Sequence, residues 1–143
     1  MRPSRFGAGM APGTTFMNQT FIATVVSWID GDSLKASLSL GLGITLVKNV
    51  RVFGIDTPEI HSTNPEEVVA AKKARDYAIA LAPPDSLVSL VGCGEDKYGR
   101  ILATVIGLDG KNIGDEQLAA DNARPYFGNK KLPWPWPPKC SPP

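Results

Sequence analysis

The chain has 143 residues, which suits one compact domain and leaves too little for two of ordinary size. Its 15 basic and 14 acidic side chains give a net charge of +1, which excludes a strongly basic protein that attracts polyanions over its whole surface. The hydrophobic fraction of 43% is typical of a globular domain, and no apolar run is long enough to span a membrane.

Three strands are predicted first, at 21–29, 33–40 and 44–55. The first is rich in Ile, Val and Trp, and Asp30-Gly31 after it is a strong hairpin signal. The second alternates apolar and polar residues. The opening of the domain is therefore expected to be a three-stranded meander.

A helix is predicted next, because Asn64 precedes Pro65 and two glutamates, a typical capped helix start. Pro83-Pro84 ends it. Two further strands, 87–91 and 101–106, are expected on either side of a loop at 92–99, and a second helix is expected from a cap at Asn112 to about Asn122. This order favours an α+β fold: a five-stranded Greek-key β-barrel of the OB-fold type with two helices, a third being left open.

The two ends of the chain differ from the middle in composition. Residues 1–19 lack the apolar segment of a secretory signal, so we expect a flexible leader and an intracellular protein. Residues 129–143 are rich in proline and tryptophan, which predicts an extended or disordered tail. The tail could dock on a partner, or its tryptophans could pack on the domain itself. The intervening residues, 20–128, form the predicted domain.

Asp32 is the first unusual polar residue. It shares strand parity with Leu34, Ala36, Leu38 and Leu40, so its carboxylate should point to the apolar side. An unpaired carboxylate there is costly unless it binds a cation. The alternative is an Asp-Gly-Asp turn that faces water.

Arg51 and the segment Asp56-Thr57-Pro58-Glu59 form a second polar cluster. Arg51 lies within an apolar strand, where it could form a salt bridge or contact phosphate oxygens. Pro58 ends the strand and exposes backbone carbonyls beside two carboxylates. Arg51 and Asp56 should lie on opposite faces of a regular strand, but a bulge at Gly54 could bring them to one face.

A third polar segment, Asp96-Lys97-Tyr98-Gly99-Arg100, forms a turn that places Arg100 at the start of the next strand. All three clusters fall at strand ends of one small barrel. Oxygen ligands of this kind favour Ca²⁺ or Mg²⁺ over zinc or copper. Two arginines opposite such a cation suit phosphoryl chemistry.

These motifs, in this order, closely resemble those of the staphylococcal nuclease (thermonuclease) family. They are Asp30-Gly31-Asp32-Ser33, Val50-Arg51 through Ile55-Asp56-Thr57-Pro58-Glu59, and Asp96-Lys97-Tyr98-Gly99-Arg100. The resemblance implies a calcium-dependent nuclease that hydrolyses phosphodiester bonds of single- and double-stranded DNA and RNA and leaves 3′-phosphate ends. It implies a monomer with one Ca²⁺ and no obligate protein partner.

The resemblance also implies a role for each matching residue. Asp32 and Asp56, with the Thr57 carbonyl, would be the calcium ligands. Arg51 and Arg100 would bind the scissile phosphate, and Glu59 would be the general base. Lys97, Arg124 and Tyr126 would contact substrate.

The chain departs from the family in two ways. The third, C-terminal helix is replaced by the proline- and tryptophan-rich tail, and no secretory signal supports a secreted role. Because a secretory signal is lacking, a virus-encoded enzyme is one interpretation of the chain. The main alternative function is a non-catalytic OB-fold module that binds nucleic acid or acts as a scaffold, and a second is an adaptor that works through the tail.

Overall fold

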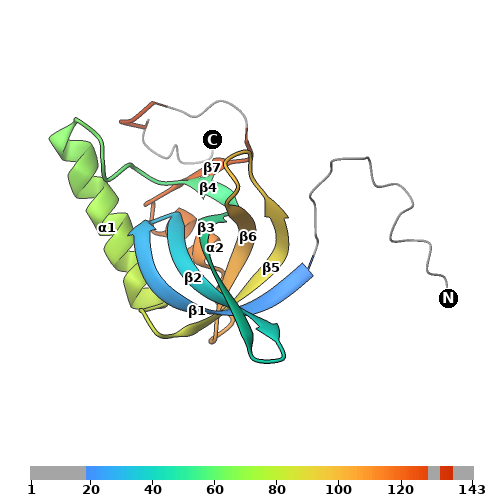
Figure 1. The fold of residues 1–143 in the computed structure, drawn as a ribbon. Coiled ribbons are helices and arrows are strands. Elements are labelled where there is room, and N and C mark those ends of the chain that lie inside the picture. The colour runs from blue at the N-terminus through green and yellow to red at the C-terminus, as the bar shows by residue number, and fades with distance from the viewer. Residues whose placement is uncertain (1–18, 129–132, 137–143) are drawn as a thin grey trace, which may run out of the picture.

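A computed structural model describes residues 19–128 and 133–136 (Figure 1). Five strands close a barrel in the order β1-β2-β3-β6-β5, in which β3 and β6 run parallel and all other neighbours run antiparallel. The strands are β1 (Gln19–Asp30), β2 (Ser33–Gly41), β3 (Ile44–Val52), β5 (Leu87–Glu95) and β6 (Ile101–Gly107). The predicted fold class is confirmed: the described chain is a five-stranded α+β barrel with two helices.

The barrel interior follows from the alternation of side chains along each strand. In β6 every second residue is buried, beginning with Ile101 and Ala103, as expected for a strand with one face in the core. Leu34, Ala36 and Leu38 of β2 are buried as the pattern predicted, but Leu40 is exposed because it lies near the end of the strand. Cys93 is also fully buried, and this burial raises the pKa of its thiol. Cys140 and most of the predicted tail lie outside the described residues.

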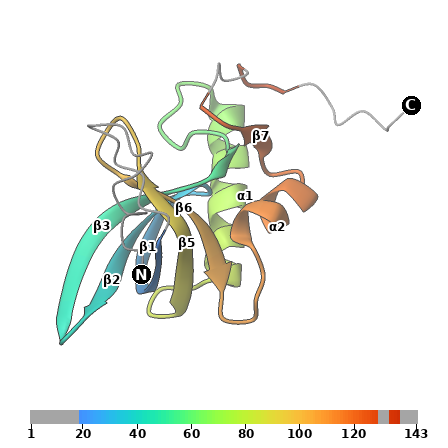
Figure 2. The same ribbon diagram turned by 90° about the vertical axis from the view of Figure 1, so that its right-hand side faces the viewer.

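The two helices lie on one side of the barrel (Figure 2). Helix α1 (Pro65–Leu81) begins at Asn64, whose side chain accepts a hydrogen bond from Glu66 N at 2.9 Å. It buries three alanines, Ala71, Ala74 and Ala78, against the barrel and α2. Neither helix is long and apolar enough to cross a membrane.

Helix α2 (Ile113–Ala119) is shorter than expected, because Asp121 adopts a positive φ of 61° just after its end. Its cap is the predicted Asn112, which accepts a hydrogen bond from Asp115 N at 3.1 Å. Strand β5 is longer than expected, since a register shift between Val91 and Gly94 lets it continue to Glu95. The loop predicted at 92–99 is therefore shorter than expected, and only the turn between β5 and β6 remains of it.

The predicted third strand is divided in two. Gly54 has a φ of +89°, a conformation that glycine adopts without strain, and the chain turns there from β3 into β4 (Gly54–Asp56). Strand β4 leaves the barrel and pairs with β7 (Arg124–Tyr126), a strand that the sequence pattern did not predict. This small second sheet lies at one end of the barrel (Figure 1).

Candidate active site

Asp32 lies in the tight turn between β1 and β2 and points into the protein. Asp32 is only 6% exposed, so the alternative prediction, a turn whose carboxylate faces water, is wrong. One carboxylate oxygen lies 2.8 Å from Arg51 Nη1 and accepts a hydrogen bond from Thr57 N at 3.0 Å. The other accepts from Ser33 Oγ at 3.1 Å. The carboxylate therefore joins the turn to β3 and to the end of β4.

Arg51 also reaches Asp56. The turn at Gly54 brings the two residues to one side, and Arg51 Nη2 lies 3.6 Å from Asp56 Oδ1. Their side chains are 8% and 10% exposed, so this pair and the Arg51–Asp32 pair are shielded from water. Buried charges of opposite sign interact more strongly than charges at the surface. Removing one partner destabilises the protein, because it leaves the other charge buried and unpaired.

The cluster offers a hard divalent cation the oxygen atoms of Asp32 and Asp56, although the described residues contain no group of three or more His, Cys, Asp or Glu side chains placed to hold a metal. Asp32 and Asp56 carry two negative charges against the single positive charge of Arg51. Beside them, burial raises the pKa of Asp30, and the charges of Asp32 and Glu59 raise it further, although a hydrogen bond from Ile60 N lowers it. The net charge of this cluster is therefore negative. Thr57 Oγ1 and Arg51 Nη2 are both buried with no hydrogen-bond partner among the described residues, so the cluster leaves a hydroxyl and a guanidinium nitrogen for a further ligand.

Glu59 lies on an exposed loop, but the loop is fixed at its backbone. Glu59 N donates to Glu67 Oε2 of α1 at 3.1 Å, and Ile60 N donates to Asp30 Oδ1 at 3.2 Å. The other oxygen of the Glu67 carboxylate accepts from Ser62 Oγ at 2.7 Å. These contacts fix the backbone of Glu59, whereas its side chain is exposed and its charge acts on nearby Asp30.

Arg100 is held by the hairpin between β5 and β6. Asp96 accepts hydrogen bonds from Arg100 N at 2.9 Å and from Arg100 Nε at 2.7 Å. The two Nη groups of Arg100 make no hydrogen bond to the described residues, and the guanidinium lies 5.5 Å from the centre of the Tyr98 ring. The hydrogen bond at Nε therefore orients the Arg100 guanidinium, and its two Nη groups remain open to a ligand.

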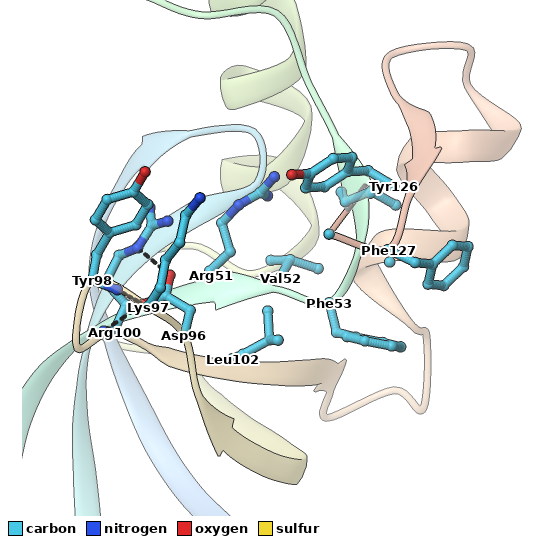
Figure 3. A pocket seen from close by; sticks show the side chains of 13 residues that line it. Arg51, Val52, Phe53, Asp96, Lys97, Tyr98, Arg100, Leu102, Tyr126 and Phe127 are labelled. Atoms are coloured by element: carbon cyan, nitrogen blue, oxygen red, sulfur yellow. Dashed lines mark hydrogen bonds and ion pairs between the residues drawn. The ribbon is translucent and has the colours of Figure 1, made fainter. Parts of the chain in front are cut away.

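Arg51 and Arg100 line the same cavity, which has a volume of about 550 Å³. Figure 3 shows Arg51 turned towards Tyr126, with Lys97, Tyr98 and Arg100 on the other side. Val52, Ile55 and Leu102 contribute apolar wall, and Phe53 packs edge-on against Phe127 at 5.6 Å between centroids. A hollow with cationic heads and aromatic edges suits a phosphate that carries a sugar and a base.

The predicted site residues divide into three groups. Arg51, Lys97, Arg100 and Tyr126 line the cavity. Asp32, Asp56 and Thr57 lie behind Arg51, in contact with it or with each other, and Glu59 lies on the adjoining loop. Arg124 is the exception, because it does not line the cavity. Its guanidinium binds Asp121 Oδ1 at 2.7 Å and lies 5.1 Å from the Trp136 ring centre.

Gln117 supports the site and was missed by the sequence reasoning. It is fully buried in α2, and its Nε2 donates to Gly31 O at 3.1 Å and to Ala74 O at 2.8 Å. Its Oε1 accepts from Asn122 Nδ2 at 3.0 Å. Gly31 is required at this point, since an added Cβ would lie 2.7 Å from Ala74 Cβ. The only sequence signal was a glutamine on a short helix, which is commonly exposed.

Comparison with known proteins agrees with this geometry. The family model described as staphylococcal nuclease homologue matches residues 49–131, more than half of the chain. The chain is also similar to endonuclease YhcR of Bacillus subtilis (strain 168), with 32% identity over 106 residues. That match covers 69% of this chain and 8% of the relative, so the chain spans a small part of the relative's length. With the barrel order and the arrangement of the three motifs, the family match shows that the chain belongs to the staphylococcal nuclease homologue family.

Proposed function

We propose that this protein is a nuclease that hydrolyses phosphodiester bonds of DNA and RNA with the help of one Ca²⁺. The observation that carries the proposal is the position of Arg51. Its guanidinium faces a cavity shared with Arg100 and is paired on its other side with two buried carboxylates. A phosphate-binding surface and a cation-binding cluster are thereby joined through one side chain.

In this proposal Asp32, Asp56 and the Thr57 carbonyl hold the cation. When bound, it would supply charge neutralisation at the phosphate and an activated water. So few protein ligands imply a weak, open site that waters and substrate complete. The hydrogen bonds at Asp32 orient its carboxylate before any cation arrives.

The protein's own side chains would do the remaining work. The open Nη groups of Arg100 and the cavity-facing edge of Arg51 bind the non-bridging oxygens and offset the charge that develops at phosphorus. Glu59 accepts a proton from the attacking water. The bond between phosphorus and the 5′-oxygen breaks, the 5′-oxygen takes up a proton from solvent, and Glu59 releases its proton to solvent, so that a 3′-phosphate and a 5′-hydroxyl result.

Lys97 and Tyr126 would contact the nucleotides beside the scissile bond, since both line the cavity. Arg124 is a weaker candidate because Asp121 and Trp136 already engage it. Trp136 in this position also favours a tail that packs on its own domain over an adaptor tail.

The proposal is tested by degradation of single-stranded DNA in calcium, in magnesium and in chelator, with Glu59→Ala as the variant. We expect calcium-dependent cleavage with 3′-phosphate ends, and a rate at least about 10²-fold lower in the variant. Glu66→Ala is the matched control, because Glu66 is an exposed glutamate seven positions along the chain. Absence of cleavage by folded wild-type protein under every condition would favour the non-catalytic binding module instead.

A further inference from the structure

The far end of the β2–β3 hairpin is an exposed apolar surface that the proposed reaction does not use. Figures 1 and 2 show this end projecting beyond the rest of the barrel, away from the small β4–β7 sheet. Four large aliphatic side chains between positions 40 and 46 are 43–99% exposed, and we call them the apolar tip: Leu40, Leu42, Ile44 and Leu46. Single exposed aliphatic side chains are ordinary, but a contiguous group of them marks an interaction surface.

The apolar tip continues the inward face of the barrel past the point where other strands cover it. Leu38 of β2 is buried in the core and is paired with Leu46 of β3, which is 45% exposed. Ile44 has the same strand parity as Leu46, so both side chains lie on this face. The opposite face carries the pair Ser39 and Thr45, whose hydroxyl groups suit a polar environment. The end of the hairpin is therefore amphipathic.

Leu42, in the turn of this hairpin, has a strained backbone conformation. Its φ is 56°, in the left-handed region that bulky residues rarely adopt. Its side chain is 99% exposed, so no packing against the described chain offsets this strain. Asn adopts such a conformation more readily, because its short polar side chain can form local hydrogen bonds. A large aliphatic side chain here is therefore best explained by an apolar surface that covers it.

The charges behind the apolar tip favour an anionic surface. Residues 33–55 include two lysines and one arginine but neither Asp nor Glu. The arginine is already paired with carboxylates at the other end of the hairpin. Lys35 and Lys48 form no ion pair within 4.0 Å with a described acidic group. Lys48 is opposite the buried Ala36 and Lys35 lies on the other face, so each face of the hairpin carries one ammonium group.

A lipid bilayer fits these features better than a second copy of the chain. The apolar tip presents on the order of a few hundred Å² of apolar surface. A stable dimer buries about 800 Å² on each partner, which is considerably more. A bilayer needs only aliphatic side chains that enter the acyl-chain boundary to about 5–10 Å, with cationic groups near the headgroups. Lysine stems can extend along the hairpin and bring their ammonium groups to the lipid phosphates.

We propose that the apolar tip, together with Lys35 and Lys48, binds the protein to anionic lipid membranes. Peripheral binding of this kind needs no membrane-spanning segment. Ser33 and Arg51 are paired at the end of the hairpin opposite to Leu42, so the cavity at Arg51 lies away from the bound lipid and open to nucleic acid. The inference goes beyond the proposed function and does not depend on it.

The test is cosedimentation of the whole chain with vesicles of phosphatidylcholine, with and without phosphatidylglycerol. We expect the partition coefficient to be at least about 10-fold higher on the mixed vesicles, and to fall with added salt. Leu42→Asn should lower the partition coefficient about 10-fold, because an aliphatic side chain no longer leaves water. Asn tolerates the positive φ at this position, so the variant should melt no lower than the wild type.

Two further variants separate a specific site from a general surface effect. Val69→Ser removes a 69% exposed aliphatic side chain from α1, outside the hairpin, at little cost in helix propensity. Its partition coefficient should stay within about twofold of the wild-type value. Lys35→Gln/Lys48→Gln should bind mixed vesicles about 10-fold more weakly and leave binding to phosphatidylcholine unchanged, whereas Lys35→Arg/Lys48→Arg should keep most of the binding.

The proposal is overturned if the wild type does not bind mixed vesicles, if Leu42→Asn binds them as well as the wild type, or if Val69→Ser loses as much binding. Gel filtration tests the second copy, since a dimer that Leu42→Asn dissociates would assign the apolar tip to self-association and overturn the lipid proposal. Leu42→Asn should cleave DNA at the wild-type rate, because Leu42 does not line the cavity. A protein that binds mixed vesicles through Leu42 but cleaves nothing would refute the nuclease proposal and leave this one standing.

Discussion

The two arginines of the cavity are held in opposite ways. Arg51 has a side chain that is 8% exposed and lies near two carboxylates, that of Asp32 in the β1–β2 turn at 2.8 Å and that of Asp56 at the end of β4 at 3.6 Å. Arg100 is 32% exposed and binds one carboxylate, that of Asp96, four residues before it in the same hairpin. The first arginine therefore joins separate segments of the fold, whereas the second belongs to a local turn.

This difference separates two roles that the same residue type can have. Removing Arg51 leaves Asp32 and Asp56 buried without their counter-charge, so its loss should affect folding as well as chemistry. Removing the Arg100 side chain leaves an Asp96 carboxylate that still accepts hydrogen bonds from the backbone N of residues 98 and 100, so its loss should affect chemistry much more than folding. The comparison can be tested by measuring stability and activity on the same variants.

The largest expected effect is that of Arg51→Gln. We expect the free energy of unfolding to fall by about 3–5 kcal/mol, because one partner of a buried charge pair is lost. The cleavage rate should fall at least about 10²-fold, since a charge-stabilising donor is removed. Urea unfolding followed by circular dichroism measures the first quantity, and cleavage of single-stranded DNA under conditions where the variant is folded measures the second.

Arg100→Gln is the matched comparison for Arg51→Gln. It should lose a similar factor in rate but change the free energy of unfolding by no more than about 1 kcal/mol, the usual range for a partly exposed pair. A stability loss in Arg100→Gln as large as that in Arg51→Gln would contradict the division of roles. So would a near-wild-type cleavage rate in either variant.

A smaller effect is expected from Gln117→Leu. The change keeps the side chain's approximate size but leaves Gly31 O, Ala74 O and Asn122 Nδ2 without their buried partner. We expect a loss of about 2 kcal/mol in the free energy of unfolding. We also expect kcat to fall by about 10-fold with KM little changed, because the turn that contains Asp32 loses the hydrogen bond from Gln117 Nε2 to Gly31 O.

The control for Gln117→Leu is Ala119→Gln, on an exposed position of the same helix. It should change the free energy of unfolding by less than about 0.5 kcal/mol and leave cleavage unaltered. Loss of stability in Gln117→Leu with unchanged kcat in the folded protein would show that Gln117 supports the core but does not position Asp32.

The part of the fold that the sequence predicted is the part that depends on local pattern. Alternation in β2 placed Asp32 inward, and Asn64 and Asn112 marked both helix starts. Gly54 was identified as the residue that could turn Asp56 towards Arg51, and the structure has it at positive φ. Each of these inferences needed only a few neighbouring residues.

The parts that were missed depend on closure of the whole barrel. Strand β7 has three residues and no distinctive pattern, and it exists because β4 offers it an unpaired edge. Gln117 reaches a carbonyl 86 positions away, which no local signal reveals.

The smallest expected effect sharpens the description of Arg100. Burial tends to raise the pKa of Asp96, but hydrogen bonds from Arg100 N, Tyr98 N and the Arg100 side chain outweigh it and hold the pKa below its ordinary value of 3.8. A carboxylate with a lowered pKa in the folded state stabilises the protein above its unfolded pKa, and this contribution is lost as the pH falls through the folded pKa. At neutral pH the wild type should therefore melt a few degrees above Asp96→Asn. That difference should shrink as the pH falls below about 4. Thermal unfolding of both proteins across this range measures it, and a difference that stays constant with pH would show that the Asp96 charge does not hold Arg100 in place.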